Sequence, residues 1–456
     1  MPVKMRHSTS LLAVALMAPA AAPAQTETEL SVQSRYPPLQ FEGAAPGGAH
    51  PIGGPSKAFV DRAGAILEGT GLALTLHVSG EVSRFDAGTV EPPAVSRREW
   101  GTLHAAVAAG PEAGGLAAAL GIPANSGLAF GEMLSGGVPF GMTADELMGW
   151  VYAGGGLELH QAFYDEAFDG ALKVLPVAIT GAQAAGFFPE PLPAEGGDAA
   201  MAAFCAMPII LRYPGGARAI IRDACEAVGG GVDSIGRATR CERADAPCGP
   251  GHPGNPVVNP PQRLTFGGFA PGMIPHSMAA NGNIDAFELN MPAGHVQFLK
   301  LAAGQADRPD AEADLAAVTP PWFYVTGWHQ PWLYAELIVN RAVWDGLGPE
   351  RRRLIEAAAR ESVLATYAER SAMQGAAVRT LEAAGATALR WPDALAERLR
   401  AAAPGALSRM AETAAAEGDD TLARLLASMD AYAKAQAAWF DSDDLGQGSA
   451  GLPERP

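Results

Sequence analysis

The stretch that decides the fold runs from Asn283 to Trp332; it begins NIDAFELNMP (residues 283–292) and ends WFYVTGWHQPW (residues 322–332). The first part predicts a strand that delivers a carboxylate to its end, where Pro292 stops the hydrogen-bonded ladder. The second part is an aromatic-rich turn with a Gly and a Pro. A charge, backbone amides and apolar walls are the materials of a small-ligand cleft, so this stretch predicts one.

Bulk composition places the chain among globular proteins. It has 456 residues, of which 48% are hydrophobic and 18% are charged, and this length suffices for two or three domains with large cores. The formal net charge of −17 argues against nucleic acid as a partner, because phosphate binding needs a basic face.

The N-terminus has the features of an export signal. Lys4 and Arg6 form a short basic region, residues 11–16 are apolar, and Ala22-Pro23-Ala24 fits a small-x-small cleavage site. A membrane anchor would need about 20 apolar residues, and this run is shorter and rich in Ala. We therefore expect residues 1–24 to be a signal peptide cleaved after Ala24, and the mature protein to lie outside the cytoplasm.

Four cysteines are candidates for disulfide bonds in an exported protein. Cys241 and Cys248 bracket a Pro-containing polar loop, which favours this pair. Cys205 and Cys225 either pair with each other or lie buried as free thiols, and the residues alone leave both alternatives open. None of the four lies in a Cys-x-x-Cys motif, which argues against a redox or zinc role.

Hydrophobic periodicity and turn residues predict alternating strands and helices. The first strand, helix and strand have the spacing of an α/β domain. Thr143 and Glu146 form a capping-box-like helix start, and the apolar run containing Pro176 is typical of a buried central strand. Strands are predicted at 29–36, 72–78, 171–179 and 209–213, and helices at 57–67, 157–164, 217–228, 350–384, 393–401 and 411–438.

Four separated segments carry a resemblance to a known family: 138–159, 180–188, 211–215 and 283–332. They resemble the solute-binding proteins of tripartite ATP-independent periplasmic (TRAP) transporters, and most closely the branch that binds 2-oxo acids and related monocarboxylates. The similarity covers residues 135–400 with a gap across an irregular insertion, whereas residues 29–134 match only in outline.

This resemblance implies an α/β, two-lobed fold like that of periplasmic binding proteins, with crossing strands and a long domain-spanning helix. Ligand would bind in the cleft between the lobes, which close over it. The expected divisions are 25–182 for lobe I, 183–289 for lobe II with an insertion at 229–261, 290–345 for the return to lobe I and the cleft-lining turn, 346–440 for helices on both lobes, and 441–456 for a flexible tail.

Two expected ligand-binding residues lie in the second lobe. In the family an Arg in an Arg-x-Pro-Gly setting clamps the ligand carboxylate, and Arg212 occupies that setting. A guanidinium presents paired donors that match two carboxylate oxygens and keeps its charge. Gln183 matches the Gln at which the family's chain crosses into the second lobe and contacts ligand or ion. The ordinary alternatives are a salt-bridged Arg after a strand and an exposed loop Gln.

Glu288 matches the Glu of the family's Asp-Ala-x-Glu pattern. It would hold Arg212 in place or take part in an ion site, unless it is an ordinary exposed carboxylate. The next family position is usually aromatic, and Leu289 here removes a ring wall. We therefore expect a reshaped or larger pocket, to which the backbone carbonyl of Leu289 could still contribute a ligand.

Gln330 is the main departure from the 2-oxo-acid branch, in which a Glu after the Gly-Trp-His turn helps to bind a sodium-like cation. The cation set implied here is Gln183, Glu288, Leu289 and Gln330, and it is weakened because Gln330 brings an oxygen but no charge. Trp328 walls the cleft or packs in a core, as does Trp332. His329 and His295 are not expected to be metal ligands, since neither has a second ligand at helical or hairpin spacing.

These observations predict the extracytoplasmic solute-binding protein of a TRAP-type uptake system. It would capture a small organic carboxylate, similar to a 2-oxo or 2-hydroxy acid, and pass it to TRAP membrane subunits; a homodimer is left open. One alternative is a ligand-sensing periplasmic subunit of a signalling receptor. The other is an exported hydrolase or lyase, which the absence of Gly-x-Ser-x-Gly, His-Glu-x-x-His and P-loop motifs argues against.

Overall fold

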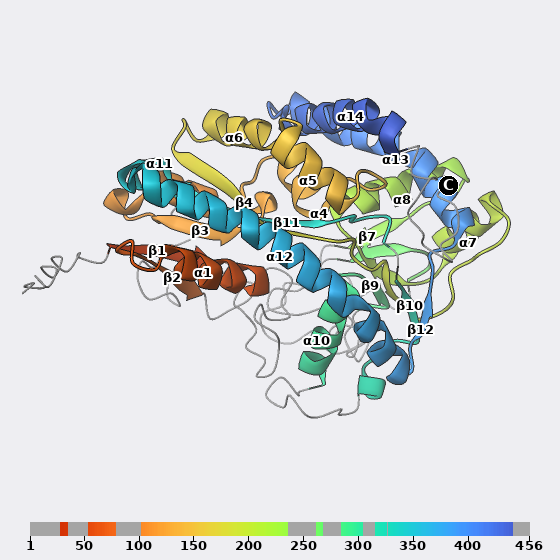
Figure 1. Cartoon of the computed structure of the whole chain (residues 1–456). Coiled ribbons are helices and arrows are strands. Elements are labelled where there is room, and N and C mark those ends of the chain that lie inside the picture. Colours follow the sequence, from red (N-terminus) through yellow and green to blue (C-terminus); the bar gives the residue numbers. More distant parts are fainter. Residues whose placement is uncertain are drawn as a thin grey trace, which may run out of the picture.

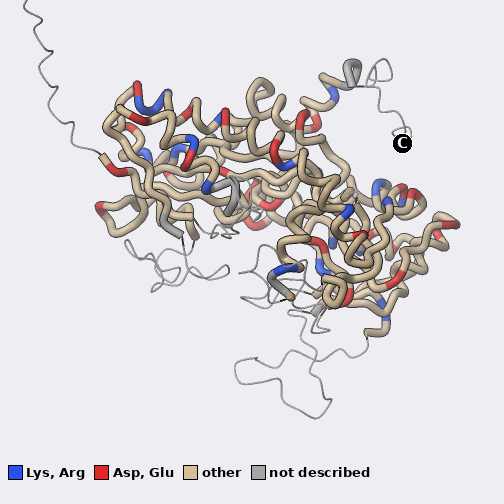
Figure 2. Tube along the Cα trace, turned by 60° about the horizontal axis from the view of Figure 1, so that its bottom comes forward, with Lys and Arg blue, Asp and Glu red and all other residues tan. Residues whose placement is uncertain are grey.

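The computed structural model describes residues 28–34, 53–78, 102–235, 261–267, 284–303, 315–325 and 327–440. These residues form two mixed sheets flanked by helices (Figure 1). The predicted signal peptide, the Cys241–Cys248 pair and the tail at 441–456 lie outside them. Figure 2 shows acidic and basic residues interspersed along the described trace. None of the helices described here has both the length and the apolar character of a membrane span.

The first sheet has five strands and contains the predicted α/β unit. Its order is β2 (Leu72–Val78), β1 (Thr28–Ser34), β3 (Ala118–Gly121), β11 (Leu333–Asn340) and β4 (Leu172–Thr180). β1 pairs in parallel with β2 and β3, and α1 (Gly53–Leu67) lies between β1 and β2 in sequence, as predicted. β11 is antiparallel to β3 and β4.

β4 lies at the edge of this sheet, so the predicted central position is wrong although the strand is present. The strand is nonetheless almost wholly buried, because α12 (Gly348–Ala383), α5 (Ala144–Ala153) and α6 (Gly156–Ala167) pack against it. The apolar run thus reflects helix cover. Pro176 fits an edge strand, since it cannot donate to a ladder, and it lies opposite Glu336, where the register with β11 shifts.

The second sheet has seven short strands and is built around the deciding stretch. Its order is β12 (Thr387–Leu389), β10 (Trp322–Tyr324), β5 (Gly186–Phe188), β9 (Ala286–Phe287), β6 (Ile210–Arg212), β8 (Thr265–Gly267) and β7 (Asp233–Ile235). β9 is shorter than the strand predicted before Pro292, and Pro292 begins α10 (Pro292–Ala302). Residues 322–324, predicted to lie in the turn, form β10.

The chain crosses between the sheets three times, the last time through α12, which leads from β11 in the first sheet to β12 in the second. It leaves the first sheet after β4 and enters the second at β5, then returns between β10 and β11. The long helix α12 packs on α1 and β4 beside the first sheet and on α10 and β12 beside the second. Figure 1 shows it running the length of the molecule across both regions. The predicted crossing strands and domain-spanning helix are therefore present.

The C-terminal helices connect the two cores. The prediction of a break near residue 401 is wrong, because α13 continues from Asp393 to Ala416 with Pro404 inside it. An internal proline costs a helix about 3 kcal/mol, and burial on either side offsets this cost: Leu399 packs in the core of the second sheet and Leu407 in that of the first. α14 (Thr421–Phe440) follows and packs on α4 (Phe130–Gly136), α5 and α6.

Several smaller features complete the fold. Thr143 and Glu146 form the predicted capping box of α5. A disulfide joins Cys205 to Cys225, the first of the two alternatives left open by the sequence, and ties α7 to α8. The remaining elements are α3 (Leu103–Ala109), α7 (Asp198–Ala206), α8 (Gly215–Ala227), α11 (Arg341–Gly346) and the 3-10 turns Pro111–Ala113, Pro123–Asn125 and Leu315–Ala317.

Candidate ligand-binding site

Three of the segments singled out in the sequence meet where the chain crosses between the sheets. The backbone N–H of Gln183 donates to the carbonyl of Gln330 at 3.0 Å, and that of Ala184 donates to the carbonyl of Asn290, also at 3.0 Å. Gly327 makes this approach sterically feasible, because a Cβ there would lie 2.2 Å from the Gln183 carbonyl oxygen. The structure therefore brings Gln183 and Gln330 together, as the prediction of a shared site requires.

Arg212 and Glu288 also lie together, because β6 and β9 are parallel neighbours with Arg212 in register with Phe287. Nη1 of Arg212 donates to the backbone carbonyl of Glu288 at 2.8 Å and forms an ion pair with its carboxylate. The Arg212 side chain is 18% exposed, whereas that of Glu288 is fully buried. The buried carboxylate thus holds the guanidinium at the edge of the core, where it keeps partial exposure.

His329 completes this cluster and was not assigned a role from the sequence. Its Nε2 lies 3.2 Å from Oε2 of Glu288, and its ring stacks on Tyr213 at 4.9 Å between centroids. Burial alone would raise the pKa of Glu288, but the charge of Arg212 and the contact with His329 outweigh it and hold that pKa below its usual value. The only sequence signal for His329 was its place in the Gly-Trp-His-Gln turn.

Trp328 lies in an aromatic stack that joins the turn to the first lobe. Its ring stacks on Phe140 at 5.1 Å and meets Tyr213 edge-on at 6.1 Å, and its carbonyl accepts from the N–H of Phe140 at 2.9 Å. Phe140 has a φ of +57°, an unfavourable conformation for a side chain of this size. Trp332, in contrast, is fully buried and donates to the carbonyl of Leu134 at 3.0 Å, so it is a core residue.

Polar atoms without partners gather at the same place. Gln183 Oε1, Trp328 Nε1 and His329 Nδ1 are buried and have no hydrogen-bond partner among the residues that the structure describes. Buried polar side-chain atoms are normally satisfied, since an unmade hydrogen bond costs about 1–3 kcal/mol. Buried atoms elsewhere, such as His104 Nδ1, also have no partner in the described ranges, but these three belong to the crossing segments, where a polar ligand site is expected.

A small cavity marks the seam between the lobes beside this cluster. Its volume is about 10 Å³, and it is lined from the first lobe by Glu132 and Pro139, from the second by Pro214 and Gly216, and from the turn by His329 and Gln330. Glu132 and Phe140 are therefore further residues that sequence reasoning missed. Phe140 lies in the quoted Val138–Thr143 segment, whereas nothing in the sequence marked Glu132.

The four residues proposed for a cation do not form one set of available oxygen ligands. The carboxylate oxygens of Glu288 face Arg212 and the ring of His329. The amide nitrogen of Gln330 points to the first lobe, lying 2.0 Å from where a Cβ of Gly136 would stand. Leu289 is half-buried and adds no side-chain ligand. Within the described ranges, no group of three His, Cys, Asp or Glu residues could hold a metal ion. The residues present thus do not fit a tightly held cation.

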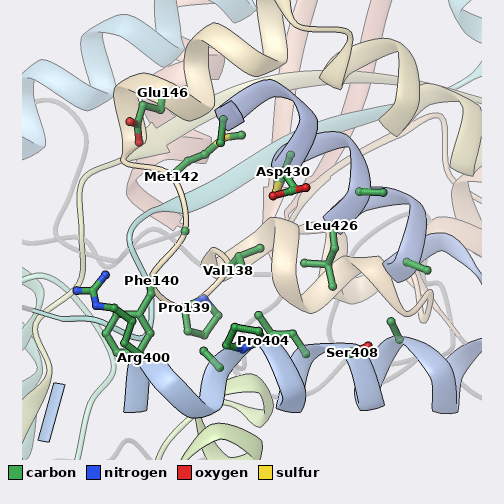
Figure 3. A pocket seen from close by; sticks show the side chains of 18 residues that line it. Val138, Pro139, Phe140, Met142, Glu146, Arg400, Pro404, Ser408, Leu426 and Asp430 are labelled. Carbon is green, nitrogen blue, oxygen red and sulfur yellow. The ribbon is translucent and has the colours of Figure 1, made fainter. Parts of the chain in front are cut away.

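A much larger cavity, of about 780 Å³, adjoins the site at Pro139, which also lines the small cavity, and at Phe140, which stacks on Trp328. It is an open groove between the 138–142 segment, α13 and α14, and Figure 3 shows Phe140 and Arg400 at one end of it. The Arg400 guanidinium lies 4.7 Å from the centre of the Phe140 ring. None of the predicted ligand-binding residues lines this groove, so we place the candidate site at the crossing segments instead.

Comparison with known proteins finds several solved structures that are similar to this one. No family model and no curated protein matches the sequence. The fold is similar to a TRAP periplasmic solute-binding protein from Pseudoalteromonas atlantica T6c with bound sodium and pyruvate, at a TM-score of 0.62 and 17% identity over 93% of this chain and 100% of that one. A TRAP transporter solute-binding protein from Bordetella bronchiseptica RB50, with calcium and picolinate in its active site, has a TM-score of 0.59 and 16% identity over 91% and 95%.

A third similar structure is a marine metagenome TRAP solute-binding protein specific for pyroglutamate, with a TM-score of 0.53 and 13% identity over 90% of this chain and 99% of that one. All three span nearly the whole of this chain. The predicted likeness is thus confirmed at the level of fold: the chain has the two-lobed architecture of TRAP solute-binding proteins.

Proposed function

We propose that this chain is the extracytoplasmic solute-binding protein of a TRAP-type uptake system and that it captures a small organic carboxylate between its lobes. The observation that carries the proposal is Arg212, partly exposed at the cleft edge and fixed from behind by the buried Glu288. A held guanidinium offers paired donors without a further entropy cost of ordering. Lobe closure over the bound ligand would complete the site.

The ligand class follows from the site and from similar structures. Bound pyruvate, picolinate and pyroglutamate in those structures are all small acids with one carboxylate. In this chain Gln183, Trp328 and His329 contribute unsatisfied polar atoms near Arg212, which suit the second oxygen or nitrogen of such an acid. We propose a 2-oxo or 2-hydroxy acid, bound by Arg212 with Gln183, Glu288, Leu289, Gln330 and Trp328 around it.

Location, partners and organisation are part of the same proposal. Cleavage after Ala24 would release the protein into the periplasm, where TRAP membrane subunits would receive the ligand. The proposed lobes are 25–182 and 183–289, with 290–345 shared between the sheets, since β10 pairs in the second and β11 in the first.

Sodium or calcium accompanies the ligand in two similar structures. Here we propose binding without a required cation, because Gln330 replaces a charged ligand.

Thermal unfolding of the mature protein against a panel of carboxylates tests this function. A ligand that binds only the folded state at a hundred times its dissociation constant stabilises by about 2.7 kcal/mol, so an acid of the right class raises the midpoint. Arg212→Ala should weaken binding by about 1.5–3 kcal/mol, the range of a charged hydrogen bond. The exposed Arg353→Ala is the matched control. Equal affinity in wild type and Arg212→Ala would refute the clamp.

A further inference from the structure

Glu132 makes a contact across the seam between the lobes. It lies on α4, whose neighbouring Met133 and Leu134 pack in the core of the first sheet. Its Oε1 accepts a hydrogen bond from the N–H of Gly216 at 3.1 Å, at the start of α8 in the second lobe. A Cβ on Gly215 would lie 2.9 Å from both carboxylate oxygens. A carboxylate from one lobe therefore occupies the positive end of a helix in the other.

The surroundings of this contact belong to the candidate ligand site. Glu132 lines the small seam cavity together with His329 and Gln330. His329 is fully buried, and its Nδ1 has no hydrogen-bond partner in the described part of the chain. This orphaned nitrogen is an observation independent of the helix end, and it indicates that a polar ligand group belongs at the seam that His329 and Glu132 both line.

Charge is nearly balanced around the seam. Arg212 and Arg218 carry the positive charges, and Glu288 and Glu132 carry the negative ones. Arg218 is half-buried and donates to the carbonyl of Tyr213. Burial and the charge of Arg212 lower its pKa, against the opposing effect of Glu132 and Glu288. Arg222, exposed on α8, adds a third positive charge that acts on Arg218. Three cations thus face two protein carboxylates, so the cleft has room for one negative charge from a ligand, while a second would face Glu132.

We propose that Glu132 determines the charge selectivity of the cleft. Its carboxylate occupies the N-terminus of α8, so that ligands with one carboxylate bind and those with two are repelled. This inference rests on the proposed function. It differs from the role of Arg212, which attracts any carboxylate, because Glu132 acts only against a second one. Selectivity of this kind comes from a repulsive element rather than from tighter contacts.

Matched acids test this selectivity. 2-Oxovalerate and 2-oxoglutarate have the same five-carbon chain and differ in the terminal carboxylate, so their affinity ratio isolates the second charge. Calorimetric titration should show that wild type prefers 2-oxovalerate. Glu132→Gln keeps an oxygen for the Gly216 N–H but removes the charge, and we expect it to bind 2-oxoglutarate about tenfold more tightly, since Glu132 is exposed and the repulsion is partly screened.

Two further variants test whether the effect comes from the charge of Glu132 rather than from its side-chain shape or from the net charge of the protein. Glu132→Asp retains the negative charge and should keep the wild-type ratio. Glu112→Gln removes an exposed charge from a 3-10 turn outside the cleft, and should change neither affinity. An unchanged ratio in Glu132→Gln, with binding otherwise intact, overturns this inference alone. Failure of wild type to bind any carboxylate, or binding that is indifferent to Arg212→Ala, overturns the proposed function and this inference together.

Discussion

Among the described residues each sheet buries one glutamate completely, and the two environments differ in how far the partner side chains are exposed. Glu336, on β11 of the first sheet, receives His104 Nε2 at 2.8 Å and the Tyr164 hydroxyl at 2.9 Å on one oxygen, and His160 Nε2 lies 3.1 Å from the other. Glu288, after β9 of the second sheet, has Arg212 and His329. The first cluster is enclosed, whereas the second reaches the cleft through Arg212.

This difference shows how a buried carboxylate that stabilises the fold can be told from one that belongs to a binding site. Around Glu336 the partners are buried side chains of the same lobe, so the cluster is closed to solvent, although His104 Nδ1 and His160 Nε2 have no hydrogen-bond partner among the described residues. Around Glu288 the guanidinium is partly exposed, and His329 Nδ1 and Gln183 Oε1 have no partner among the described side chains. A depressed carboxyl pKa occurs in both. A partly exposed charge, rather than a depressed pKa or unsatisfied atoms, distinguishes the candidate site.

Removing the enclosed carboxylate should have the largest effect on stability. Glu336→Ala leaves two histidines and a tyrosine buried without their acceptor, and breaking such a network costs about 3–5 kcal/mol. We expect the free energy of unfolding, from urea titration followed by circular dichroism, to fall by this amount. Glu112→Ala, an exposed control, should change it little. A loss below about 1 kcal/mol would show that the cluster is not a structural network.

Acid should distinguish the two lobes through separate pH windows. Burial opposes ionisation of Glu336, yet His104 and His160 lower its pKa from 4.5 to about 2. Because its folded pKa is the lower one, its stabilisation is present above pH 4.5 and is lost as the pH falls from 4.5 to 2. Burial lowers the pKa of His295, near Glu288, from 6.5 to about 4. The unfolded chain then takes up the proton first, so stability falls between pH 6.5 and 4.

Across each pH window the free energy of unfolding should fall by about 3 kcal/mol, at 1.36 kcal/mol per pKa unit. Urea unfolding at stepped pH measures both. Glu336→Gln should weaken the dependence between pH 4.5 and 2 and leave the part contributed by Glu288, whose pKa is also lowered. His295→Gln should remove the dependence between pH 6.5 and 4. If the curve of His295→Gln coincides with that of wild type in the upper window, the second lobe does not bury a neutral histidine.

Local pattern predicted the elements of this fold better than their placement. The strand, helix and strand of the first 78 residues follow from periodicity, since each buries one face. The position of β4 and the continuity of α13 through Pro404 were not predictable in this way. In both cases tertiary packing decides, because α12 covers an edge strand and two cores hold the helix on either side of its proline.

The residues of the candidate site were likewise only partly predictable from the sequence. Arg212, Glu288, Gln183 and Gln330 could be singled out because they lie in short motifs that a family resemblance makes recognisable. His329 and Glu132 could not, since their importance depends on which groups they meet across the fold: one contacts Glu288 and the other reaches α8. A sequence records that a carboxylate is present but not that a helix of another lobe begins 3.1 Å away.

The smallest expected effect comes from restoring a carboxylate at position 330, and it sharpens the contrast between the two clusters. If the surroundings of Glu288 are open to ligands, Gln330→Glu adds a charged oxygen ligand beside Gln183, and hard cations bind more tightly as carboxylates accumulate. We expect ligand affinity to become dependent on calcium or sodium by a few-fold, about 1 kcal/mol, whereas wild type shows no such dependence. Thermal shift with and without each cation measures it. Gln262→Glu at an exposed residue supplies the matched addition of one negative charge. Cation dependence already present in wild type would mean that Gln330 coordinates through its carbonyl oxygen and that Glu288 turns toward the ion when ligand binds.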